Sequence, residues 1–153
     1  MYYREDEGKT TMTESEWQDC LRQMDENEQY ISAWQPAEPD AAAKRCVQSR
    51  HRTLAHLRAC QESWLEACLA FDQKLSPRLK MLHPWRVFEQ KSYELIAWED
   101  HLAVYLADRA RWKQLLKSAD RHKSGKINDK EHSIESLTKR LVAHEHHHLF
   151  TPR

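Results

Sequence analysis

Glycine is scarce in this chain, with Gly8 and Gly125 the only two among 153 residues. Turn-rich β folds need many residues with positive φ, a conformation that glycine adopts at least cost. Charged residues make up 31% of the chain, so most of each helix surface must be solvated. Six tryptophans and five tyrosines still supply large side chains for a core. This composition predicts an all-α fold of amphipathic helices, each with one buried stripe.

The first helix is predicted over residues 13–34. Thr13 and Glu16 have the spacing of a capping box, in which each side chain bonds to the other residue's backbone. Pro36 and Pro39 follow the apolar stripe and end the helix, because proline cannot continue it.

Apolar residues spaced three or four apart predict two longer helices, one over 41–75 and one over about 85–119. Prolines at 77 and 84 interrupt the chain between them. Residues 121–130 contain turn-forming residues and are predicted to be a loop, followed by a last helix over about 130–149. We therefore expect a bundle of about four main helices, with the two long central helices antiparallel.

The length of the chain favours one folded unit. Residues 1–12 are polar and are predicted to form a flexible N-terminal tail, and residues 13–153 are predicted to form a single helical domain.

Charge is unevenly distributed along the chain. Residues 1–40 hold eleven acidic and three basic residues, whereas residues 109–130 hold eight basic and two acidic ones. A basic ridge on a helix can bind nucleic acid or an acidic protein surface. The alternatives are a solvated face or a dock for the acidic N-terminal helix. The candidate binding residues are Arg109, Arg111, Lys113, Lys117, Arg121, Lys123 and Lys126.

Three short segments, residues 54–58, 71–75 and 96–103, resemble stretches of the PriC family. The resemblance implies a small helical protein of replication restart that binds single-stranded DNA and its coating protein.

Residues 120–131 fit the twelve-residue frame of an EF-hand calcium loop. Several residues depart from that motif, because His122 stands where an oxygen ligand is expected and four basic residues make the loop positive. A plain helix–loop–helix turn is the alternative. The oxygen ligands would come from Asp120, Ser124, the Lys126 carbonyl, Asn128 and Glu131.

The C-terminal run His144-Glu145-His146-His147-His148 formally matches the H-E-x-x-H pattern. On a helix, His144 and His148 would share one face, as the zinc ligands of metallopeptidases do. Those enzymes need a third protein ligand, usually downstream, and the five residues after His148 include no His, Asp or Glu. One interpretation is that these histidines bind nickel or zinc by chance. The other is that they cover the end of the helical bundle.

The four cysteines lack C-x-x-C spacing, and we interpret them as reduced core residues of a cytoplasmic protein. No catalytic triad, phosphate-binding loop or membrane-spanning stretch is found in the sequence.

We therefore expect a non-enzymatic adaptor without a cofactor that binds a protein partner, with nucleic acid as a second partner of the basic ridge. A protein–protein adaptor or coiled-coil-like homodimer without nucleic acid is the first alternative. A weak calcium-binding helix–loop–helix protein is the second.

Overall fold

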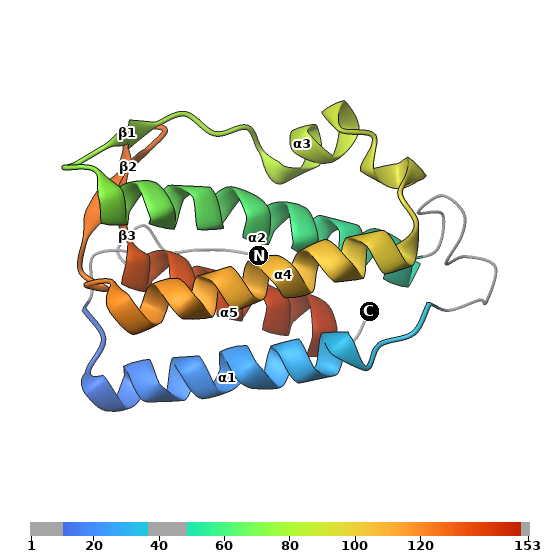
Figure 1. Cartoon of the computed structure of the whole chain (residues 1–153), viewed down its shortest axis with the longest axis horizontal. Helices are drawn as coiled ribbons and strands as arrows, with labels where there is room; N and C mark the ends of the chain where they lie inside the picture. The colour runs from blue at the N-terminus through green and yellow to red at the C-terminus, as the bar shows by residue number, and fades with distance from the viewer. Residues whose placement is uncertain (1–10, 37–48, 151–153) are drawn as a thin grey trace.

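The computed structural model of the chain describes residues 11–36 and 49–150. Figure 1 shows a bundle of long helices, with shorter elements along one side of it and at one end. The long helices are α1 (Glu14–Ser32), α2 (Ser49–Gln73), α4 (Trp98–Ser118) and α5 (Ile134–Phe150). The predicted helical bundle is therefore confirmed. The predicted tail up to residue 10 and the predicted helix over 41–48 lie outside the described residues.

Helix α1 begins where the capping box predicts it. The Glu16 amide donates to Thr13 Oγ1 at 3.1 Å, and the Thr13 amide donates to Glu16 Oε1 at 3.1 Å. These two bonds satisfy backbone donors that the first turn of a helix otherwise leaves unpaired.

The two long central helices, α2 and α4, run in the same direction, which differs from the antiparallel arrangement predicted. Near their N-terminal ends, the rings of His51 and Trp98 lie 5.7 Å apart. Further along, Gln61 Nε2 donates to the Tyr105 carbonyl at 2.8 Å. The reason is the connection between them, which returns along the bundle so that α4 starts at the end where α2 started (Figure 1).

The helix predicted over 85–119 is interrupted. The structure has α3 (Pro84–Gln90), the 3₁₀ turn η2 (Tyr93–Leu95) and then α4. Ser92 adopts a left-handed conformation with φ of 53°, which an α-helix cannot contain. Phe88 and Tyr93 then pack against α2 in a small apolar cluster of their own.

The segment predicted as a loop over 121–130 forms most of a β-hairpin, with strands β2 (Ser124–Ile127) and β3 (Lys130–Ser133). Asn128 and Asp129 have φ of 50° and 69°, as a two-residue hairpin turn requires. Strand β1 (Arg78–Leu79) pairs in parallel with β2 and completes a three-stranded sheet at one end of the bundle.

The interior contains a buried ion pair between Arg109 of α4 and Glu145 of α5, both fully inaccessible to solvent. Glu145 also accepts from the Tyr105 hydroxyl at 2.5 Å, and Arg109 Nε donates to Gln61 Oε1 at 2.7 Å. A buried charge is tolerated only when it is paired and hydrogen-bonded, as here.

Of the helices that the structure describes, none combines the length and apolarity needed to cross a membrane.

Candidate metal centre

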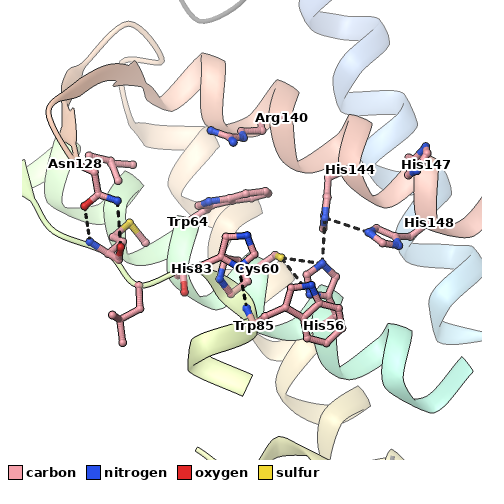
Figure 2. A pocket seen from close by; sticks show the side chains of 15 residues that line it. His56, Cys60, Trp64, His83, Trp85, Asn128, Arg140, His144, His147 and His148 are labelled. Carbon is pink, nitrogen blue, oxygen red and sulfur yellow. Dashed lines mark hydrogen bonds between the residues drawn. The ribbon is translucent and has the colours of Figure 1, made fainter. Parts of the chain in front are cut away.

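Two helices bring four donor side chains to one place in the bundle. His56 and Cys60 lie one turn apart on α2, and His144 and His148 lie one turn apart on α5. Residues four apart share a helix face, so each helix presents a pair. Figure 2 shows the three imidazoles and the thiol pointing toward one another.

The donor atoms are close together. His144 Nε2 lies 3.3 Å from His56 Nε2 and 3.2 Å from His148 Nε2. Cys60 Sγ lies 3.6 Å from His56 Nε2. The donor atoms of His56, Cys60 and His144 all lie within 4.8 Å of one another.

Burial keeps the central imidazoles neutral. Loss of solvation, followed by the influence of His148, lowers the pKa of His56 to about 4 and that of His144 to about 3. Burial likewise raises the pKa of the Cys60 thiol well above its usual range. At neutral pH the cluster therefore offers imidazole lone pairs, the form in which histidine binds metals.

A shared cation explains this arrangement better than hydrogen bonding alone. Nε2 of His144 carries either one proton or one lone pair, so it can satisfy one neighbouring nitrogen well but not two. A tetrahedral zinc ion with bonds of about 2.0–2.1 Å separates two nitrogen ligands by about 3.3–3.4 Å. The observed separations of 3.3 and 3.2 Å are close to that value. The donor set therefore fits a divalent cation that prefers imidazole.

Aromatic rings hold these side chains in place. The His56 ring stacks on Trp85 with centroids 4.4 Å apart and planes 13° apart. The His144 ring meets the Trp64 ring edge-on at 5.5 Å. Nδ1 of His144 is buried without a hydrogen-bond partner, so ring packing, and not the usual carboxylate or carbonyl, sets its orientation.

The donors line a cavity of about 500 Å³. Its walls come from α2, α5, the connection at residues 81–85 and the hairpin turn. Small-molecule sites typically have volumes of about 300–1,000 Å³. The cluster is therefore placed where a bound molecule could reach it.

The H-E-x-x-H pattern does not work here as it does in a metallopeptidase. Glu145 points into the core and is committed to Arg109 and Tyr105, so it cannot act as a base beside His144 and His148. In metallopeptidases the third ligand usually follows the motif in sequence. Here the third histidine is His56, which precedes the motif.

The residues of the EF-hand-like frame are spread over the hairpin. Asp120 Oδ1 accepts from the His122 amide at 2.9 Å, and Ser124 pairs with Ser133 across the strands. Lys126 pairs with Glu131, and Asn128 occupies the tight turn. The calcium-loop interpretation is wrong, because an extended hairpin does not wrap these oxygens around one ion.

The seven basic candidates do not form one free ridge. Arg109 is buried, Arg111 lies 3.5 Å from Asp108, and Lys123 lies 3.7 Å from Asp72. Lys117 is exposed near the end of α4, and Lys126 lies in β2.

Two of the basic candidates dock the acidic first helix, as one of the alternatives anticipated. Lys113 Nζ contacts Asp25 at 2.7 Å and Glu28 at 2.6 Å, both on α1. Arg121 pairs with Glu14 of α1 at 3.0 Å and with Glu135 at 2.8 Å.

His56 and Cys60 were not singled out as ligands from the sequence. The available signal was their spacing of four on a predicted helix, which matches that of His144 and His148. Metal sites in helical bundles are commonly built from such pairs on facing helices. Cys20, Cys60 and Cys68 are free thiols and buried, as predicted, whereas Cys46 lies outside the described residues.

No protein-family model matches the chain, and the PriC resemblance stays a prediction. No curated protein matches it either. The structure is similar to that of YfiT from Bacillus subtilis, with a TM-score of 0.76 and 14% sequence identity. The alignment covers 97% of this chain and 87% of YfiT. YfiT is described as a probable metal-dependent hydrolase with an unusual four-helix bundle topology. The likeness establishes a shared fold.

The prediction of a non-enzymatic adaptor with a nucleic-acid-binding ridge is wrong, and two findings contradict it. The donor atoms of His56, Cys60 and His144 form a group that could hold a metal ion, which the adaptor hypothesis does not explain. The similar fold belongs to a protein described as a probable hydrolase. The basic ridge is also largely engaged in contacts within the chain.

Proposed function

We propose that this chain is a metal-dependent hydrolase that binds one divalent cation through His56, His144 and His148. The observation that carries the proposal is that His144 Nε2 lies 3.3 Å from His56 Nε2 and 3.2 Å from His148 Nε2, with all three side chains lining the cavity. The fold shared with YfiT supports it. Three protein ligands with one open position are typical of catalytic zinc sites, whereas structural sites are closed.

A divalent cation bound there supplies Lewis acidity, which polarises a carbonyl or phosphoryl oxygen and makes water acidic enough to act as a nucleophile at neutral pH. The residues of the chain provide the ligands, orient them and shape the cavity. Neutral His56 and His144 give up no proton when they bind the cation, so binding at neutral pH has little protonation cost.

His83 is placed to donate a hydrogen bond into the cavity. The Trp85 amide donates to His83 Nδ1 at 3.2 Å, so Nδ1 is an acceptor and the hydrogen of the neutral ring resides on Nε2. The side chain lines the same cavity as the histidine cluster (Figure 2). His83 can thus donate a hydrogen bond from Nε2 to an oxygen of a bound substrate or leaving group, and the described lining residues include no carboxylic acid for this task.

The first test is metal content. The full-length protein, stripped with chelator and dialysed against zinc, should retain about one zinc per chain by mass spectrometry of metals. His56→Gln, His144→Gln and His148→Gln should each lose it. His146→Gln is the matched control, because His146 is exposed on the same helix and contacts Phe150. Zinc retained by the His144→Gln variant would contradict the proposed site.

The second test is hydrolysis of p-nitrophenyl acetate and p-nitrophenyl phosphate. Turnover should require the cation, disappear with chelator and fall about 100-fold in His83→Gln without loss of zinc. Activity that survives both chelation and His144→Gln would show that hydrolysis does not use this centre.

A further inference from the structure

The cavity beside the histidine cluster has a marked chemical bias. Its described lining includes Arg140 and five histidines, but neither aspartate nor glutamate. A divalent cation held by neutral imidazoles would add positive charge to that of Arg140. Such a site favours a ligand that brings negative charge.

Arg140 lies one turn before His144 on α5, on the face of the helix that carries the cluster. Its guanidinium carbon lies 5.4 Å from the centre of the Trp64 ring, and the same ring contacts His144. One indole therefore contacts both the guanidinium and a histidine of the cluster, and Figure 2 shows the Arg140 side chain over the Trp64 ring. Four residues of helix correspond to about 6 Å of rise, so an anionic group at Arg140 would hold its neighbouring atoms near the cluster.

Much of the remaining wall is apolar, with Ser63 and Asn128 among the polar lining residues. Trp64, Met81, Pro84 and Ile127 line the cavity, and Leu82 and Trp85 are exposed at its surface. Exposed apolar side chains grouped around a cavity are typical of ligand sites. This surface suits an aromatic or aliphatic body.

We infer that the substrates are small organic anions, with a carboxylate or phosphate group bound by Arg140 and an apolar body between Trp64 and Trp85. This inference rests on the proposed function and names the substrate class of the same site. Arginine suits the role because its planar guanidinium can give two parallel hydrogen bonds to either anion.

Binding is tested by calorimetry with phenylacetate, phenyl phosphate and the neutral phenylacetamide, on both zinc-loaded and metal-free protein. The two anions should bind at least about tenfold more tightly than the amide. Arg140→Gln should remove that preference while leaving amide binding unchanged, and Arg140→Lys should retain part of it. Arg86→Gln, an exposed arginine of α3, is the control and should match the wild type.

The two proposals fail in different ways. Amide binding as tight as phenylacetate binding, or an unchanged preference in both Arg140 variants, would overturn the substrate class even if zinc is bound. A preference that depends on Arg140 in a protein that binds no zinc would support the anion site and contradict the metal centre. A preference for only one of the two anions would decide between carboxylate and phosphate.

Discussion

Neighbouring residues on α5 have opposite roles. His144 faces the cavity, whereas Glu145 faces the core and pairs with Arg109. A helix turns about 100° per residue, so adjacent side chains reach different surroundings. The H-E-x-x-H match thus includes two ligands of the proposed metal site, His144 and His148, and one residue of the buried ion pair, Glu145.

Cys60 is the donor whose role in the cluster can be tested separately. Because the proposed site takes its three protein ligands from histidines, we expect the Cys60 thiol, whose sulfur lies 3.6 Å from His56 Nε2, to stay outside the ligand set. Cobalt-loaded protein should then show visible bands of a low-symmetry site without an intense sulfur-to-cobalt charge-transfer band in the near ultraviolet. Cys60→Ser should keep both the spectrum and the cobalt affinity.

Cys68→Ser is the control for that experiment, since Cys68 is also buried on α2 but outside the cluster. A charge-transfer band that disappears in Cys60→Ser but not in Cys68→Ser would make Cys60 a ligand, and His148 would then not be needed as the third donor.

At the scale of elements, the hairpin β2–β3 positions one wall of the cavity. The Met81 amide donates to Asn128 Oδ1 at 3.1 Å, and Asn128 Nδ2 donates to the Met81 carbonyl at 3.1 Å. This pair of bonds, visible in Figure 2, ties the connection at 81–85 to the hairpin turn.

Gly125 lets β2 approach the helices, because an added Cβ would lie 2.6 Å from the Phe71 ring and 2.8 Å from the Pro77 carbonyl oxygen.

Asn128→Ala should lower the free energy of unfolding by about 1–2 kcal/mol, because both bonds are lost and alanine tolerates the left-handed turn less well. Urea denaturation measures the stability, and hydrogen exchange at the Met81 amide reports the connection. Asn128→Gly separates the two causes, because glycine accepts the turn but cannot make the bonds. Unchanged exchange at Met81 in the glycine variant would show that the side chain does not hold the connection.

At the scale of the whole molecule, the parallel pair α2 and α4 creates the site. Because α4 follows the direction of α2, α5 runs antiparallel to both, and its C-terminal half passes beside the N-terminal half of α2. His144 therefore meets His56 across the bundle. The polar core around Arg109 also joins α1, α2, α4 and α5, through its bond to the Met24 carbonyl at 2.9 Å among others.

Buried neutral histidines should make the metal-free fold sensitive to acid. Burial lowers the pKa of His56 and His101 to about 4 and that of His144 to about 3, below the unfolded value near 6.5. The unfolded chain therefore binds more protons below pH 6.5. Stability should be complete above that pH and fall as the pH drops toward 4, by on the order of 2–3 kcal/mol per histidine.

Urea denaturation of metal-free protein at pH 7 and pH 5 measures this loss. His144→Gln should reduce the difference between the two pH values, whereas His146→Gln, at an exposed position, should not. Equal stability of the wild type at both pH values would contradict the neutral state of these side chains in the folded protein.

The sequence by itself determined the helical class and many helix limits. The scarcity of glycine is a property of composition and indicates helices directly. The capping box at Thr13 and the breaks near prolines depend on contacts within a few residues, so a short stretch of sequence predicts them. The break at Ser92 and the pairing of the hairpin with β1 were not predicted, because packing against α2 and pairing with a distant strand decide them. The pair His144 and His148 was recognised because four residues span one helical turn.

Only the tertiary structure decided that this pair belongs to a larger cluster. His56 and His144 are 88 positions apart in sequence, and no local pattern selects one among ten histidines. Their meeting depends on the parallel direction of α2 and α4, which the return of the connection along the bundle imposes. Burial between Trp64 and Trp85 then keeps the imidazoles neutral, and this turns a surface-like histidine run into a candidate metal centre.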